Sequence, residues 1–331
     1  MDITVHKEFN EIFETASSIH LYYHPERKSK EVMVKNSDIP VDTIHKKFQP
    51  FLDRYYDVFK ENFTSSDNDP FFFEDYALDW MITIAEMVAK NSHWLVDFAN
   101  LSEEEVYREI VEYLFTEKSV GSMDEIIAKL EEESLPFHIC WKWILILKSP
   151  KKYLRMYIKI INNNLQAYQK ARAAVDGDVA VLLKQFTEPP QEFLARFTTF
   201  IKGDYEFYPT LCNPFLMSMT EGGSIFCGLY MNELIEREVR KEKPRETLAG
   251  MFKMLADRNK IEILFMLKEE SMYNLQIAGE LGISAATTTH HMTSLLTRGF
   301  VAAEKREGKV YYTLQREQIK EAIADLEAVF L

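Results

Sequence analysis

The stretch that decides the fold is Glu280–Val301, which reads ELGISAATTTHHMTSLLTRGFV. Gly282 and Gly299 stand where two successive helices should end, because glycine adopts the left-handed conformation that closes a helix. Ser284 stands where the second of these helices should begin, because its hydroxyl can accept a hydrogen bond from the first turn. The spacing therefore predicts a helix from residue 285 to about residue 297, directly preceded by another helix.

The expected helix has two different faces. Its inner side carries Thr288, Met292, Leu295 and Leu296 at helical spacing. Its outward side chains are small or polar, namely Ala285, Ala286, Thr287, Thr289, His290 and Thr293. A thin helix of that composition suits a DNA major groove, where hydroxyls, imidazoles and methyl groups reach the base edges.

The flanking sequence predicts the rest of a winged helix-turn-helix. Asp257 is placed to cap a helix RNKIEILFMLKEE, and Asn274 to cap LQIAGELG. After the outward-facing helix, FVAAEKREGKVYYTL alternates on both sides of a Glu307-Gly308 turn, which is typical of a two-stranded wing. A last helix is expected over about Arg316 to Phe330.

These segments resemble a known family. KMLADRNKIEIL, ELGISAATTTHHMTSLLTRGFV and KREGKVYY are similar to successive motifs of the ArsR-type winged helix-turn-helix repressors. The resemblance covers about Leu248 to Leu314, whereas residues 1–244 resemble no family that we can name. It implies a sequence-specific transcription regulator that binds a palindrome-like operator in double-stranded DNA as a homodimer. Thr289 stands where the family usually has Ser, and His291 where it usually has His.

DNA contacts are therefore expected from two elements. The recognition helix would supply Ser284, Ala285, Ala286, Thr287, Thr289, His290 and His291. The wing would supply Lys305, Arg306 and Lys309, which would bind phosphates and add affinity without much sequence information. The alternative for the wing is an ordinary charged hairpin, because Glu304 and Glu307 flank two of its cations.

Metal sensing is not expected. Many ArsR-type proteins bind metals or arsenicals through Cys, His or Asp on the helix before the recognition helix or on the last helix. Here the first place holds Asn274, Leu275, Gln276 and Ile277, and the last helix has neither Cys nor His. His20 and His24 have a spacing that can hold a metal, but no third ligand is evident, which favours a half-buried aromatic stripe. We expect no metal and no cofactor.

Charge is distributed unevenly along the 331 residues. The net charge of −13 argues against a nucleic-acid partner if it is taken as a whole. However, residues 245–331 hold 11 Lys and Arg against 12 Asp and Glu, which leaves −12 for residues 1–244. Residues 284–316 carry +3. The basic balance thus lies on the expected reading surface.

The fold class is expected to be mainly α, with a large helical N-terminal domain and a C-terminal winged helix-turn-helix. Only 11 Gly and 11 Pro occur, and helical periodicity runs nearly everywhere up to about residue 200, with a helix QEFLARFTTFIK expected over 191–202. A small β element is expected near 204–230, with Gly222-Gly223 as a hairpin turn. The charged segment Asn232 to Arg245 predicts the boundary between a domain 1–244 and a domain 245–331.

The N-terminal domain carries no catalytic motif, so we do not expect an enzyme. Its aromatic clusters, Phe71–Trp80 and Phe137–Trp143, would either form core or line a pocket for a small-molecule effector. The odd number of cysteines and the absence of a signal peptide or membrane span favour a cytoplasmic protein, and the resemblance implies a bacterial one.

Subunit pairing is expected from an apolar stripe on the last helix. The stripe consists of Ile319, Ile323, Leu326 and Phe330 at helical spacing. The N-terminal domain would sense an effector or set the geometry of the dimer. Two alternatives to a regulator stay open: an interaction scaffold whose winged helix does not read DNA, and an uncharacterised enzyme domain fused to a DNA-binding tail.

Overall fold

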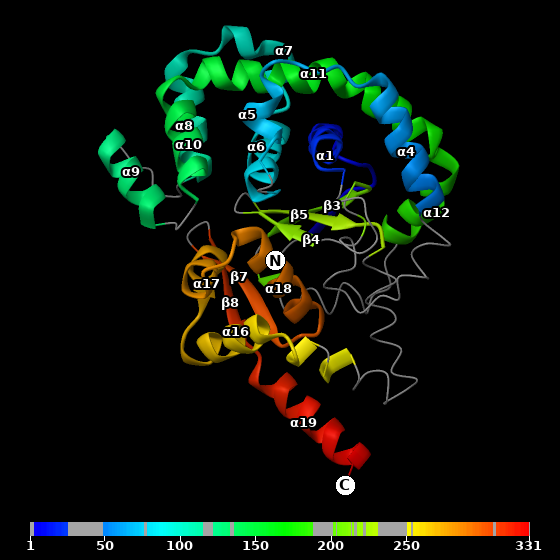
Figure 1. The fold of residues 1–331 in the computed structure, drawn as a ribbon, viewed down its shortest axis with the longest axis vertical. Helices are drawn as coiled ribbons and strands as arrows, with labels where there is room; N and C mark the ends of the chain where they lie inside the picture. The colour runs from blue at the N-terminus through cyan, green and yellow to red at the C-terminus, as the bar shows by residue number, and fades with distance from the viewer. Residues whose placement is uncertain are drawn as a thin grey trace.

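The computed structural model confirms a mainly α protein with a C-terminal winged helix-turn-helix. Figure 1 shows two parts, a helical part that covers one sheet and a smaller part that contains the wing. The structure describes residues 3–25, 49–75, 78–114, 122–132, 136–187, 201–202, 204–212, 214, 217–220, 223–230, 250–252, 254–306 and 309–330. None of the helices in these ranges is long and apolar enough to cross a membrane.

The helical part is built around one long helix, α11 (Pro150–Ala174), which arches over the others in Figure 1. Helix α1 (Glu11–Tyr23) and α6 (Leu78–Lys90) pack side by side between this arch and the sheet. The remaining elements are α4 (Gln49–Asn62), α5 (Asp69–Phe73), α7 (Trp94–Asp97), the 3-10 turn η2 (Phe98–Asn100), α8 (Glu103–Leu114), α9 (Met123–Glu132), α10 (Phe137–Lys148) and α12 (Asp176–Thr187).

The aromatic clusters mostly form core. Phe72, Phe73, Trp80 and Trp143 are all buried, and the Trp80 and Trp143 rings meet edge to face with centroids 4.9 Å apart. Phe137 and Trp141 are exceptions, because they lie on the exposed side of α10. The clusters therefore contribute more to the stability of the helical part than to any pocket.

The first sheet has the strand order β1-β3-β5-β4. Strands β4 (Met217–Met219) and β5 (Ser224–Gly228) form the antiparallel hairpin that the sequence predicts, and Gly223 has the positive φ of +86° that its turn requires. Gly222 lies outside the described residues. Strand β3 (Tyr205–Thr210) pairs parallel to both β5 and β1 (Ile3–Val5), with Thr4 opposite Glu206. Strand β4 is an edge strand of this sheet.

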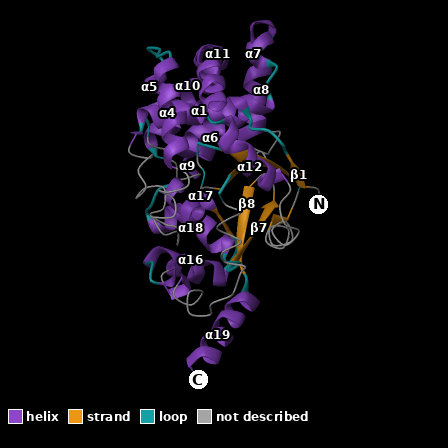
Figure 2. Cartoon of the chain, turned by 90° about the vertical axis from the view of Figure 1, so that its right-hand side faces the viewer, coloured by secondary structure: helices purple, strands orange, loops and turns teal. Residues whose placement is uncertain are grey.

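The winged part follows the expected order. It comprises α16 (Arg258–Glu269), β6 (Met272–Tyr273), α17 (Asn274–Leu281), α18 (Ala285–Thr297), β7 (Val301–Arg306), β8 (Lys309–Leu314) and α19 (Arg316–Phe330). Strands β7 and β8 pair antiparallel from Val301 opposite Leu314 to Arg306 opposite Lys309, which forms the wing. The turn Glu307-Gly308 lies outside the described residues. Figure 2 shows that α19 protrudes from this part at the carboxyl end.

One strand of the wing sheet comes from far upstream. The sheet order is β2-β7-β8-β6, and β2 consists of Ile201–Lys202, paired parallel to Ala303 and Glu304 of β7. The expected helix 191–202 is therefore wrong at its end, because the open edge of β7 gives this backbone a ladder partner. Its residues up to 200 lie outside the described residues, as does the expected boundary 232–245.

Candidate nucleic-acid interface

Local sequence fixes both ends of α18. The Ser284 hydroxyl accepts from the Thr287 backbone N–H at 3.1 Å, and Thr288 donates its own hydroxyl to the Ser284 carbonyl at 3.2 Å. Gly282 (φ +64°) and Gly299 (φ +72°) take the left-handed conformation that ends α17 and α18. The serine and the glycines thus set the length and entry angle of the candidate recognition helix.

Asn274 joins α17 to α18 rather than capping α17. Its side-chain Nδ2 donates to the Ala285 carbonyl and to the Thr289 hydroxyl, both at 3.1 Å. Helix α17 begins at Asn274 itself, and Gln276 accepts from the backbone N–H of Tyr273 at 3.1 Å. The expectation of an Asn274 cap was wrong, because the turn before α17 brings this side chain within reach of the next helix.

The N-terminal turn of α18 is the most accessible part of the helix. Ser284 and Thr287 are exposed, whereas Ala285, Thr289 and His290 are half-buried. Thr288 is fully buried, as the sequence predicts. The side chain of Ala286 lies outside the described side chains. Direct contact with a ligand is therefore most readily available to the Ser284 and Thr287 hydroxyls.

His291 does not lie on the reading face. Its side chain is 4% exposed, and its Nδ1 is 3.7 Å from a carboxylate oxygen of Asp257. Helical geometry explains the correction, because residue 291 projects to the same side as Thr288 and Leu295. Burial lowers the pKa of His291, an effect that Asp257 opposes and Lys260 reinforces. A neutral His291 in the core therefore supports the fold of the helix-turn-helix.

The three cations of the wing have partners within the chain. Arg306 donates to the Glu304 carboxylate at 2.6 Å, and the Lys309 ammonium lies 4.3 Å from the centre of the Tyr273 ring. The Lys305 ammonium lies 3.0 Å from the point where a Cβ on Gly223 would stand. Exposed ion pairs contribute little free energy, so phosphates can compete for Arg306.

The expected dimer stripe is divided between the core and the solvent. Ile319 and Leu326 pack against the apolar core of the described chain. Ile323 and Phe330 are exposed at 51% and 69%. Phe265 on α16 is 62% exposed as well, so the described residues of the winged part include three exposed large apolar side chains.

The histidine pair at the C-terminal end of α1 belongs to the core. His20 and His24 are both buried, with ring centroids 4.5 Å apart. His24 Nε2 is 3.0 Å from the Phe73 carbonyl oxygen. Within the ranges that the structure describes, no group of three or more His, Cys, Asp or Glu is placed to hold a metal ion. All three cysteines are free thiols.

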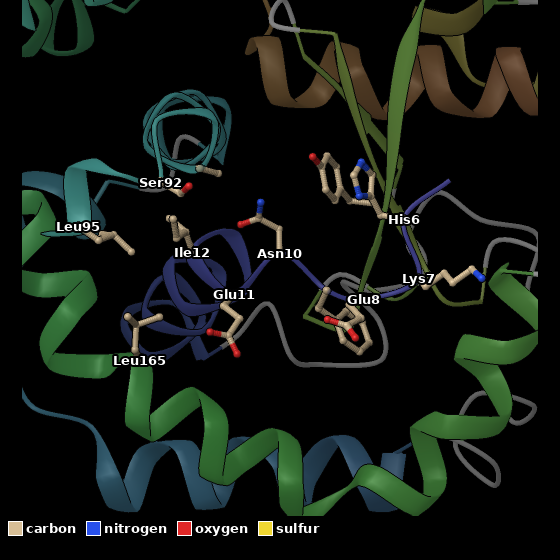
Figure 3. Close-up of a pocket in the computed structure, with 12 residues that line it drawn as sticks. His6, Lys7, Glu8, Asn10, Glu11, Ile12, Ser92, Leu95 and Leu165 are labelled. Atoms are coloured by element: carbon tan, nitrogen blue, oxygen red, sulfur yellow. The ribbon is translucent and has the colours of Figure 1, made fainter. Parts of the chain in front are cut away.

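A separate cleft of about 600 Å³ lies where β1 leads into α1 (Figure 3). His6 stacks on the Tyr208 ring at 4.0 Å between centroids, and Asn10 caps α1 by accepting from the Phe13 N–H at 3.0 Å. Both basic and acidic side chains reach the cleft. Its lining comprises His6, Lys7, Glu8, Phe9, Asn10, Glu11, Ile12, Ala89, Ser92, Leu95, Leu165 and Tyr208.

Comparison with known proteins identifies a family in the winged part of the chain. The family described as "Bacterial regulatory protein, arsR family" matches residues 257–303. The chain is 35% identical over 74 residues, 22% of its length, to the cadmium resistance transcriptional regulatory protein CadC of Listeria innocua serovar 6a. That match spans 62% of the relative, which is less than two thirds of its length.

Two further relatives match part of the chain. The CadC homolog of Staphylococcus aureus is 31% identical over 90 residues, which are 27% of this chain and 73% of the relative. The HTH-type transcriptional regulator KmtR of Mycobacterium tuberculosis is 26% identical over 80 residues, which are 24% of this chain and 60% of the relative. No solved structure matches the chain significantly.

Proposed function

Because the chain belongs, through its winged helix-turn-helix, to the arsR family of bacterial regulatory proteins, we propose that it is a sequence-specific DNA-binding transcription regulator. The observation that carries this proposal is the capped helix α18, whose N-terminal turn presents the Ser284 and Thr287 hydroxyls to solvent. Helix N-termini also attract phosphate, because their backbone N–H groups lack partners.

We assign base reading to Ala285, Ala286, Thr287, Thr289 and His290, and backbone binding to Ser284 and the wing residues Lys305, Arg306 and Lys309. His291 is removed from the contact set, because it is buried. The +3 charge of residues 284–316 supports an anionic partner, although the whole chain is acidic. Repression is proposed as the mode of regulation, by analogy with the resembling family.

The functional unit is proposed to be a homodimer that pairs through α19. Exposed Ile323 and Phe330 support this assignment, because apolar side chains on a protruding helix are costly in water. Two recognition helices would then enter major grooves about 34 Å apart on a palindrome-like site. We propose that the N-terminal part responds to a small-molecule effector, for which the cleft at His6 and Asn10 is the candidate site.

The relatives named for cadmium resistance do not extend their ligand to this chain. Where the family places Cys or His on the helix before the recognition helix, this chain has Asn274–Ile277, and Asn274 is hydrogen-bonded to α18. An amide that joins two helices is not a thiolate ligand. We therefore propose that the regulator responds to something other than a metal at this position.

The test is selection of bound fragments from a random DNA pool by the full-length protein. A defined consensus is expected, and Thr287→Ala or His290→Ala should each weaken binding to it by about 0.5–1.5 kcal/mol, the net contribution of a single hydrogen bond. His93→Ala is the matched control, because His93 is exposed in the turn after α6. Recovery of no consensus, with equal affinity for all fragments, would favour the scaffold alternative.

A further inference from the structure

The third turn of the candidate recognition helix lies against the N-terminal part, whereas its N-terminal turn is exposed. Helix α18 contacts both α6 and β4, and it lies directly against the sheet in Figure 1. Thr293, on the outward face of α18, has its hydroxyl oxygen 3.2 Å from the Met217 carbonyl oxygen of β4 and 2.8 Å from the Thr289 carbonyl oxygen. The single hydroxyl proton is therefore shared between its own helix and the neighbouring sheet.

The geometry of β4 places this contact on the outer edge of the sheet. Thr220 donates its backbone N–H to Ser224 at 3.0 Å, so Thr220 is a hydrogen-bonded position of the β4–β5 hairpin. Such positions alternate along an antiparallel strand, which directs the Met217 carbonyl away from β5. Helix α18 thus lies along the edge of β4 that no other described strand occupies.

The two elements that cover α18 are joined to each other. Glu86 of α6 is 1% exposed and accepts a hydrogen bond of 2.6 Å from the hydroxyl of Thr220, next to the end of β4. The Tyr113 hydroxyl donates to the same carboxylate, and the Lys90 ammonium lies 3.6 Å from it. Helix α6 and strand β4 therefore act as one platform, so α18 is either seated on both or on neither.

The wing is attached to the N-terminal part at two more points. Strand β2 pairs with β7, with Ile201 opposite Ala303 and Lys202 opposite Glu304, and Lys202 lies three residues before β3 begins. The Lys305 ammonium also approaches Gly223 in the β4–β5 turn. A Cβ added to this glycine would lie 3.0 Å from the ammonium nitrogen. Helix α18 thus contacts β4, while the wing contacts β2 and the β4–β5 turn.

A DNA duplex cannot occupy this arrangement. The major groove is about 12 Å wide and about 8.5 Å deep, so an inserted helix has phosphate walls on both sides. Here α6 and β4 contact the side of α18 that carries Thr293, and β4 is within hydrogen-bonding distance of its third turn, so they occupy space that a phosphate wall of the groove would need. We propose that the structure is a closed, autoinhibited state, and that α18 and the wing must separate from α6, β4 and β2 before the protein binds DNA.

This inference rests on the proposed DNA-binding function and adds a way in which DNA binding is regulated. If the closed state dominates, the measured dissociation constant equals the intrinsic one divided by the open fraction. Any ligand or subunit contact that favours the open state then tightens DNA binding without touching DNA. Ala89 of α6 lines the cleft at β1, so a ligand there would contact the helix that also holds α18.

A reversible lock tests the proposal in the full-length protein. Lys202→Cys and Glu304→Cys place two thiols on paired residues of neighbouring strands, which lie about 4.8 Å apart, within the Cα range for a disulfide. Half-buried Cys140 is replaced by Ser in every variant, while Cys212 and Cys227 are buried. Diamide takes up the two electrons and two protons when the disulfide forms, and free-thiol counting by mass spectrometry measures the yield.

The affinity for the selected DNA fragment is then compared in the two redox states. The oxidised double variant should bind at least tenfold more weakly than the same protein after reduction, because its wing cannot leave β2. The two single-cysteine variants, treated with diamide in parallel, should not change. Failure of the thiols to pair would contradict the β2–β7 register on which the closed state rests.

The remaining outcomes separate the two levels of inference. Equal, selective binding in both redox states would overturn autoinhibition and leave the DNA-binding function standing. Absence of selective binding in either state, and in the single variants, would overturn the proposed function and the inference with it.

Discussion

Replacing Thr293 by Val should tighten DNA binding. Valine keeps the shape of the side chain but removes the hydroxyl that bonds the Met217 carbonyl at 3.2 Å. A methyl group at that distance from an oxygen is also slightly crowded, because carbon–oxygen contacts prefer about 3.3–3.6 Å. Both effects destabilise the closed state. If Thr293 instead contacted DNA, its replacement by Val would weaken DNA binding rather than tighten it.

The magnitude follows from the geometry of the shared proton. A buried hydrogen bond contributes about 0.5–1.5 kcal/mol net, and sharing with Thr289 places this one toward the low end. A loss of about 0.5–1 kcal/mol from the closed state multiplies the open fraction by about two to five. The dissociation constant for DNA should fall by the same factor for as long as the closed state predominates.

The assay is fluorescence anisotropy with the selected DNA fragment and the full-length chain. Thr297→Val is the matched control, because the Thr297 hydroxyl bonds the Thr293 carbonyl one turn back, at 2.7 Å, within α18. Thr297→Val measures how much DNA affinity changes when such a hydrogen bond within α18 is lost. If Thr293→Val binds no more tightly than Thr297→Val, the contact with β4 does not limit DNA binding and the reasoning fails.

Three further predictions concern pH and assembly. Burial lowers the pKa of His291, so its contribution to stability is complete above about pH 6.5 and is lost as pH falls toward the folded-state pKa. The urea midpoint of the wild type should therefore drop between pH 7.5 and 5.5, and His291→Asn should make this drop smaller. Burial raises the pKa of Glu14 in the folded state, so stability is lost as pH rises through that raised pKa. Glu14→Gln should therefore be more stable than the wild type at pH 8 but not at pH 5. A gain in stability at pH 5 alone would refute this. Ile323→Glu with Phe330→Glu should convert a dimer into a monomer in light scattering, whereas Val96→Glu, at a residue 85% exposed on α7, should not.

Local sequence was sufficient for the winged part and for the hairpin in the first sheet. Gly282, Ser284 and Gly299 fix helix ends through conformations and caps that involve only neighbouring residues. Thr288 was correctly placed inside by helical periodicity. These features were predictable because each depends on contacts within a few residues of the chain.

The contacts that decide whether α18 is accessible to DNA could not be predicted from local sequence. Strand β1 pairs with β3 some 200 residues later, and β2 joins β7 although periodicity indicated a helix there. His291 belongs to the core because its position on α18 projects to the same side as Thr288 and Leu295, which the family resemblance alone does not indicate. Nothing in the outward pattern of α18 shows that Thr293 meets a sheet edge, since its partner is a backbone carbonyl with no sequence signature.

The seat of α18 on β4 also bears on solubility. A strand whose outward carbonyl and N–H groups lose their cover becomes a template for another strand, and exposed edges of this kind promote aggregation. Open molecules would therefore associate with one another through Met217–Met219, the more so as their concentration rises. The recognition helix thus protects the edge of β4 from other strands whenever it is not bound to DNA. A variant or ligand that releases α18 should therefore make the protein aggregate unless another molecule covers this edge.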